Sequence, residues 1–437
     1  MVVQRASRND LTELATETGT APMQIAAVLR LECPVSATTV REVLARRLPG
    51  VPRLRQRLAP APIGLGRPVW IDDPAFDLVR HVQEHRLGTP ADEATVLRVA
   101  AQAAADPLPR RRPLWAVQLV TDATGACHAV VLVVHHVVAD GIGGLAALSQ
   151  LVDSAAVPAP GRFPAPAPTR RELLRDVLDV RVRALRSLPA AGRRLRSGLR
   201  ELGLTQRDTG RPPRCSLNRP IGPRRRLAVA RVALADAVAA AHRSGATVND
   251  ILLTAVAGAL RDTLTARGEA VDRFVVSVPV SARRSAGTTE LGNRVGVMPV
   301  TVPATGDPAD RLAAIAGTTR TGRRSAGRGS SAALVSITFL ALARLGLFSR
   351  LINRQRLVNT FVTNVPGPAE PFFFAGRRIS DVIAVSPIAG NVTVAFAALS
   401  YAGTLAVTVI ADPDACPDLD LVAAALQRQF DELTRLD

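Results

Sequence analysis

The sequence predicts an α/β protein built from two large domains. Its 437 residues are enough for two domains that each bury a core of their own. Short valine-rich runs, typical of buried strands, alternate along both halves with segments of helical periodicity. A stretch rich in proline and arginine, residues 156–225, separates the halves. Two similar α/β layers are therefore expected, one within residues 1–155 and one within residues 226–437.

The first half starts with a predicted strand over residues 25–31 and a helix that begins near Arg41 and breaks at a Pro-Gly pair. His81 and His85 have the spacing of one helix face. The sequence shows no third ligand beside them, so we interpret them as packing or surface histidines and predict no metal site. WAVQLVT and HAVVLVVHH then predict a hairpin that closes over a turn at Asp122.

The most informative stretch is VVLVVHHVVADGIGG, residues 130–144. Its valines predict a buried strand that ends at His135 and His136, and Asp140, Gly141 and a helical pattern follow. Adjacent strand residues point to opposite faces, so only one histidine can face a given cleft. A neutral imidazole there can accept a proton from a hydroxyl and return it to a leaving group. The alternative is a buried strand that ends in hydrogen-bonded histidines and an Asp-Gly turn.

HHVVADG is similar to the HHxxxDG signature of the acyltransferase superfamily that includes chloramphenicol acetyltransferase and the condensation domains of nonribosomal peptide synthetases. Nearly the whole chain resembles the bacterial wax ester synthase/diacylglycerol acyltransferase (WS/DGAT) family. The resemblance implies two chloramphenicol-acetyltransferase-like domains, each a mixed sheet with flanking helices, and an active-site tunnel at their interface. It also implies that His136 is the catalytic base, that His135 orients the site or packs behind it, and that Asp140 and Gly141 belong to the same catalytic motif. Residues 156–225 would link the HHxxxDG domain to a WS/DGAT-type C-terminal domain.

Two positions depart from the family's pattern. The family has Pro-Met-His where this chain has Pro22, Met23 and Gln24, so any role of that histidine is absent. The family also has Leu-Asp-Arg before a Pro-Leu-Trp element, and here Pro109 replaces the aspartate. Trp115, the last residue of the matching Pro-Leu-Trp element, is interpreted as a core anchor.

In the second half, a strong helical pattern follows Thr247, and Thr247 or Asn249 can cap it. Asn249 and Asp250 match an Asn-Asp motif of the family, although on the residues alone they are a cap and a first-turn acid. VPVSARR resembles the family's VPVS-x-R element and points to Arg283. We predict that Arg283 pairs with Asp140 and so locks the turn that aims the imidazole.

TNVPGP, residues 363–368, replicates the family's Ser-Asn-Val-Pro-Gly-Pro with one conservative change. The Pro-Gly-Pro turn fixes the chain directly after a strand, so the Thr363 hydroxyl or the Asn364 amide is a candidate donor to an oxyanion or a substrate. A purely structural turn is the alternative. The remaining chain predicts a hairpin over Ala402 and Gly403 and an amphipathic closing helix.

All 55 basic residues are arginine, against 37 acidic residues, which gives a formal net charge of +18. The arginines are scattered or concentrated in the linker and lack interleaved aromatic residues, which argues against a nucleic-acid partner. A basic surface suits coenzyme A phosphates, an acyl carrier protein or an anionic membrane face. The basic helix expected within the linker is interpreted as a solvated face, with docking on a membrane or an acidic carrier protein as the alternative.

The four cysteines, Cys33, Cys127, Cys215 and Cys416, are widely separated and form no CxxC motif, so we expect free thiols in a reducing compartment. The N-terminal segment lacks the apolar core of a signal peptide, and no apolar stretch reaches the length of a membrane span. These features predict a cytoplasmic protein, peripheral on the inner membrane face or on lipid droplets where it contacts lipid.

By its resemblance, the chain is expected to be an acyl-CoA-dependent O-acyltransferase that esterifies a long-chain alcohol or diacylglycerol. Acyl-CoA or an acyl carrier protein is the expected donor, and no cofactor is expected. One alternative keeps the chemistry but uses a polar acceptor from specialised metabolism. Another, from a different class, is a non-catalytic binding or scaffold protein on the same fold.

Overall fold

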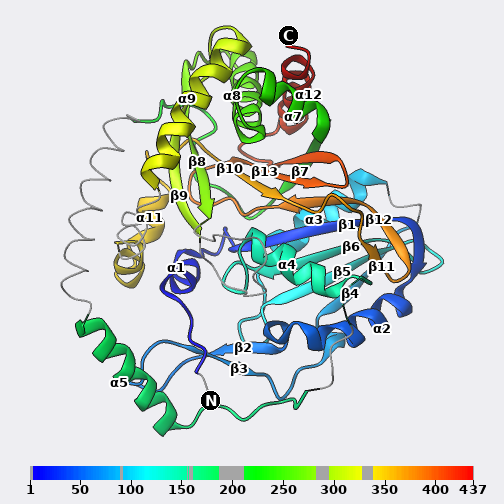
Figure 1. Cartoon of the computed structure of the whole chain (residues 1–437), viewed down its shortest axis with the longest axis vertical. Coiled ribbons are helices and arrows are strands. Elements are labelled where there is room, and N and C mark those ends of the chain that lie inside the picture. The colour runs from blue at the N-terminus through cyan, green and yellow to red at the C-terminus, as the bar shows by residue number, and fades with distance from the viewer. Residues whose placement is uncertain are drawn as a thin grey trace.

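The computed structural model contains two mixed, six-stranded sheets with flanking helices, which confirms the predicted α/β class (Figure 1). It describes residues 3–88, 92–154, 156, 161–186, 211–281, 295–326 and 338–436. The elements up to the linker are α1 (Arg8–Thr16), β1 (Gln24–Ser36), α2 (Ala37–Arg47), β2 (Gln56–Ala59), β3 (Val69–Asp72), β4 (Val82–Arg86), α3 (Glu93–Ala105), β5 (Trp115–Thr121), β6 (Ala126–His135), α4 (Gly141–Leu151) and α5 (Arg170–Arg186).

The elements after the linker are β7 (Arg226–Ala233), α7 (Leu234–Arg243), α8 (Val248–Ala266), β8 (Arg273–Ser281), β9 (Val295–Pro303), α9 (Pro308–Ala326), α11 (Phe348–Ile352), β10 (Thr360–Pro366), β11 (Phe373–Phe374), β12 (Arg377–Val385), β13 (Val394–Tyr401), β14 (Thr404–Ala411) and α12 (Leu419–Thr434). Three predictions are confirmed here: the antiparallel pairs β5–β6 and β13–β14 and the closing helix α12.

The N-terminal sheet has the order β11-β12-β1-β6-β5-β4, with β4 parallel to β5. Its central strand β6 is buried on both faces. Val130, Leu132 and Val134 pack in a core with residues of α2 and α4, whereas Val131 and Val133 pack in a core shared with the other sheet. The continuous valine run is the pattern expected of a strand with no solvent-facing side.

The C-terminal sheet has the order β7-β14-β13-β10-β8-β9, and β10 is parallel to both of its neighbours. Helices α7, α8, α9 and α12 cover the face of this sheet that points away from the N-terminal sheet (Figure 1). Strand β10 pairs with β8 at two described positions, Thr360 and Phe361, whereas it pairs with β13 from Phe361 to Pro366. The last residues of β10 therefore have β13 as their described strand partner.

The N-terminal sheet is not formed by the first half of the chain alone. Strand β12, from the second half, pairs antiparallel with β1 and extends the N-terminal sheet, and β11 pairs with β12 at its edge. The sequence of β12 is rich in β-branched residues, as is typical of a strand, but that composition does not determine which sheet edge accepts it. The second half therefore completes the sheet that carries HHxxxDG.

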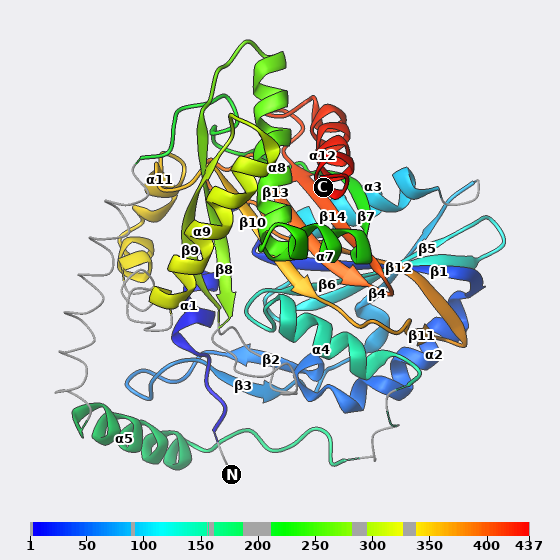
Figure 2. The ribbon, with the colours of Figure 1, turned by 45° about the horizontal axis from the view of Figure 1, so that its top comes forward.

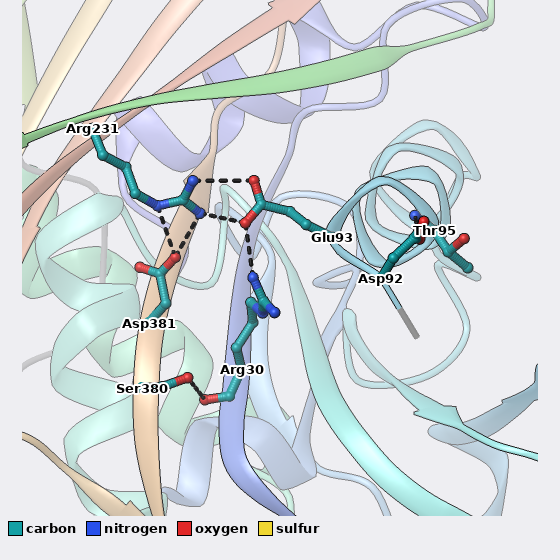
Figure 3. Close-up of polar contacts among 7 residues, drawn as sticks. All are labelled: Arg30, Asp92, Glu93, Thr95, Arg231, Ser380 and Asp381. Carbon is teal, nitrogen blue, oxygen red and sulfur yellow. Dashed lines mark hydrogen bonds and ion pairs between the residues drawn. The ribbon is translucent and has the colours of Figure 1, made fainter. Parts of the chain in front are cut away.

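A shared core joins the two sheets. Residues of β1, β6 and β12 pack there with residues of β13 and β14, and helix α3 contributes Val96 and Ala100. At its edge, Arg231 of β7 forms ion pairs with Glu93 of α3 (2.7 Å) and Asp381 of β12 (2.7 Å), and Arg30 of β1 also binds Glu93 (2.8 Å; Figure 3). Burial lowers the pKa of Arg231, but its two carboxylate partners outweigh that effect and raise it. One guanidinium thus connects both sheets and α3.

The Arg231→Met variant should lose about 1–2 kcal/mol of unfolding free energy, because Asp381, whose side chain is 17% exposed, loses this cation and Glu93 keeps only Arg30. Urea unfolding, followed by tryptophan fluorescence, measures this change. Arg226→Met is the matched control: Arg226 lies on the same strand but pairs with Asp420 on the open surface, and its loss should cost less than about 0.5 kcal/mol. Equal midpoint shifts in the two variants would show that the Arg231 network stabilises the protein no more than a surface ion pair does.

Candidate active site

The two adjacent histidines occupy different environments. His135 is the last residue of β6 and is 1% exposed, whereas His136 is the first residue of the following turn and is half-buried. The backbone N–H of Val137 donates to Nδ1 of His135 (3.0 Å). In the neutral ring this leaves the proton on Nε2. The backbone N–H of His136 donates to the Met23 carbonyl (2.7 Å).

Asp140 begins helix α4. Its carboxylate is 1% exposed and accepts the backbone N–H of Gly143 (2.7 Å), which is the bond of an N-terminal helix cap. The cap fixes the turn between His136 and the helix. Arg283, the predicted partner of Asp140, lies outside the described residues, so that ion pair stays a prediction.

Gly141 brings the HHxxxDG motif against the TNVPGP segment of the other half. A Cβ atom at Gly141 would lie 3.0 Å from Cγ2 of Val365, so β10 approaches the first turn of α4 closely. Figure 2 shows α4 below the lower ends of the C-terminal sheet. Val365 and Thr363 share one face of β10, and Asn364 points to the other. Of the two predicted donors, Thr363 is therefore on the face that meets α4.

Thr363 also has a local contact, since its hydroxyl lies 3.4 Å from the Phe396 carbonyl of β13. This hydrogen bond is long, and the hydroxyl proton is the only one that Thr363 can donate from its side chain. A stronger acceptor beside β10 can therefore compete for it.

Asn249 and Asp250 lie in the first turn of α8. Thr247 is the cap, and Asp250 completes a capping box by accepting the Thr247 backbone N–H (2.9 Å). The other oxygen of Asp250 accepts the Thr319 hydroxyl of α9 (2.7 Å). The described contacts of Asp250 therefore fasten α8 to α9 within the C-terminal lobe.

Sequence reasoning missed one charged residue beside the histidines. Oε2 of Glu17 lies 3.6 Å from Nε2 of His135, and Arg110 forms an ion pair with the same carboxylate. Burial raises the pKa of Glu17, but the His135 ring and the Arg110 guanidinium outweigh burial and lower it, so the carboxyl is ionised at neutral pH. Glu17 follows a short polar helix, and no motif or periodicity marks it.

Gln24, which replaces the family's histidine, is 1% exposed and pairs with His135 across β1 and β6. Its amide NH₂ lies 3.0 Å from the Asp106 carbonyl and 3.2 Å from that of Ala104, and its oxygen accepts the Leu108 backbone N–H (2.8 Å). The Gln24 side chain thus provides hydrogen-bond partners for backbone groups at and just beyond the end of helix α3, rather than facing a substrate.

The prediction that His81 and His85 share one helix face is wrong. His81 directly precedes strand β4, and His85 lies within that strand. His81 is buried and stacks on Trp115, and His85 bonds the Gln118 side chain (2.9 Å). Trp115 is 2% exposed and donates its indole N–H to the Leu54 carbonyl, which confirms it as a core anchor.

Among the described residues, no group of three or more His, Cys, Asp or Glu side chains is placed to hold a metal ion. All four cysteines are free thiols. No helix in the described ranges is both long and apolar enough to cross a membrane.

Comparison with known proteins shows the family to which this fold and motif belong. Residues 7–252 match the wax ester synthase/diacylglycerol acyltransferase catalytic domain, and residues 291–434 match the WS/DGAT C-terminal domain. A Mycobacterium tuberculosis H37Rv protein named "probable diacylglycerol O-acyltransferase" is 34% identical over 398 residues, which are 88% of this chain and 85% of that protein.

Two solved structures share the fold. The wax ester synthase/diacylglycerol acyltransferase from Marinobacter aquaeolei VT8 superposes with a TM-score of 0.68 at 21% identity, over 98% of each chain. The first condensation domain of the CDA synthetase superposes with a TM-score of 0.62 at 19% identity, over 99% of this chain and 96% of that one. The fold and the motif define a two-lobed acyltransferase. Within that class, the chain belongs to the wax ester synthase/diacylglycerol acyltransferase family.

The Gly141→Ala variant should lower acyl-transfer turnover about tenfold with little change in melting temperature. The new methyl group would press on Val365, a β-branched residue held in a strand, and would shift the end of β10 relative to α4. Gly144→Ala is the matched control on the same helix, because its methyl group would meet only Cδ1 of Ile25, the flexible end of a side chain (3.1 Å). Full turnover in Gly141→Ala would mean that the approach of the two motifs does not matter for the reaction.

Proposed function

We propose that this acyltransferase transfers a long-chain acyl group from coenzyme A to the hydroxyl of a fatty alcohol or a diacylglycerol. The family and the relative named as a diacylglycerol O-acyltransferase support this substrate class. The observation that carries the proposal is the position of His136. This half-buried residue directly follows a buried strand. It lies in the same motif as Gly141, which packs against Val365 of the other lobe.

In the proposed reaction, the His136 imidazole accepts the hydroxyl proton as the alcohol oxygen attacks the thioester carbonyl. The carbon–oxygen bond forms, and the carbonyl oxygen becomes an oxyanion that the Thr363 hydroxyl stabilises as donor. The carbon–sulfur bond then breaks, and the imidazolium returns its proton to the departing thiolate. Atoms and charges balance in these steps without a cofactor, and the rigid Asp140 cap holds the turn that carries His136.

The His136→Ala variant should release free coenzyme A at least about 10³-fold more slowly than the wild type, because the hydroxyl nucleophile then has no base. The assay supplies palmitoyl-CoA with hexadecanol or dioleoylglycerol and follows the free thiol. His128→Ala is the control, since His128 lies on the same strand but bonds only the turn residue Asp122 within the described structure.

The same assay separates the alternatives. Activity with a polar acceptor but with neither lipid would favour the specialised-metabolite enzyme. Acceptor-dependent thiol release that persists in His136→Ala would contradict the mechanism, and its absence from the wild type with every acceptor would favour the non-catalytic protein.

We further propose that helix α5 rests on an anionic membrane surface. Its inner side is anchored by Leu173 and by the ion pair of Arg5 with Asp176. Its outer side exposes Leu174 (48%) and Leu178 (49%) among basic residues, of which the helix carries six: Arg170, Arg171, Arg175, Arg181, Arg183 and Arg186. Exposed leucines flanked by arginines are typical of helices that lie in the headgroup region.

The double variant Leu174→Asp, Leu178→Asp should bind vesicles of phosphatidylcholine and phosphatidylglycerol at least about fivefold more weakly in a sedimentation assay, because two apolar anchors become anionic. Leu421→Asp, which changes an exposed leucine of α12, is the matched control. Unchanged binding in the double variant would exclude α5 as the contact.

A further inference from the structure

The Glu17 carboxylate faces His135, the buried histidine of the motif. Nδ1 of His135 accepts a backbone N–H, so the ring is held from one side. Its Nε2 is buried and has no partner within hydrogen-bond distance among the described residues, and Glu17 lies just beyond that distance at 3.6 Å. The Glu17 side chain is only 12% exposed. An ionised acceptor therefore lies next to an otherwise unsatisfied donor.

The segment that carries Glu17 is held by contacts from the first half of the chain and from the end of the linker. Arg110 pairs with Glu17 and lies 3.4 Å from the Leu14 carbonyl. Arg225, which directly precedes β7, donates to the Thr20 carbonyl (2.6 Å). Four residues separate Glu17 from Pro22, and then the Met23 carbonyl accepts the backbone N–H of His136. One short segment thus contacts the His135 ring at one end and the His136 backbone at the other.

We propose that Glu17 is a positioning residue for the acyl transfer, acting through His135. Its carboxylate holds the His135 ring with the proton on Nε2, and the ring in turn holds the Val137 backbone through Nδ1. These contacts, together with the Met23 carbonyl, set the direction in which the His136 side chain leaves the turn. The inference rests on the proposed function of His136, and Arg110 supports it by fixing the carboxylate.

The geometry explains why an acceptor is needed at this position. Without Glu17, the Nε2–H group would be buried beside no described acceptor, and the ring would gain by rotating or by admitting water. Either change releases the Val137 N–H and loosens the turn that carries His136. A displacement of about 1 Å at a catalytic group is enough to lower turnover by about 100-fold.

The test uses the full-length protein with ¹⁵N-labelled histidine and the variants Glu17→Ala and Glu17→Gln. Ring-nitrogen NMR spectra report the His135 tautomer without substrate, with the signal assigned by its absence in His135→Gln. Glu84→Gln is the matched control, because Glu84 lies on β4 of the sheet that carries His135 and also forms arginine ion pairs, here with Arg41 and Arg86. Melting temperatures verify that each variant is folded.

We expect Glu17→Ala to lose the Nε2–H signal of His135 and to lower kcat about 10- to 100-fold, with the KM for palmitoyl-CoA changed less than about threefold. Glu17→Gln should restore kcat to within about threefold of the wild type, since its amide oxygen still accepts from Nε2–H. Glu84→Gln should leave both kcat and the His135 signal unchanged.

Wild-type kcat in Glu17→Ala would overturn the proposal, and so would equal losses in Glu17→Ala and Glu17→Gln with an unchanged His135 signal. A wild-type protein inactive with every acceptor would contradict the proposed function separately. The ring-nitrogen spectra would then decide the role of Glu17: loss of the signal in Glu17→Ala supports the contact, and an unchanged signal refutes it.

Discussion

The structure depends on the core that the two sheets share. Strand β12 leaves the second half of the chain to pair with β1, and the faces of both sheets then bury their side chains against each other and against α3. Apolar contact alone has little directional preference, so the sheets could slide over this surface. Two features prevent this sliding: the fixed register of β12 against β1, and the ion pairs of Arg231 with Glu93 and Asp381.

This constraint locates the site. The motif with the histidines ends a strand of one sheet, and TNVPGP ends a strand of the other, so the two meet only if the sheets keep one relative position. The 3.0 Å approach of Val365 to a methyl group built at Gly141 shows how little space is left between them. A glycine at the start of α4 is required for this reason of space, in a position where the helix itself would accept alanine. The geometry of the candidate site is therefore a property of the lobe interface.

The local elements could be predicted from the sequence because their signals are local. The valine run of β6, the hairpin turns and the Thr247 cap each carry their pattern within a few residues. The sheet edge with which β12 pairs could not be predicted, since β-branched composition indicates a strand but not its partner. Glu17 was missed for a similar reason. Its carboxylate faces the His135 ring, 118 positions away along the chain, and no pattern in the polar segment around Glu17 indicates that contact.

Gln24 shows how a substitution at a motif position can be structural. The sequence comparison registers only that a histidine is missing. In the folded chain, the side chain at this position points to the last turn of α3, where carbonyl groups need donors and a backbone N–H needs an acceptor. A carboxamide offers two N–H groups and one oxygen from a single planar end, whereas a neutral imidazole offers one donor and one acceptor on a larger ring. Glutamine thus suits the end of α3 better than histidine would.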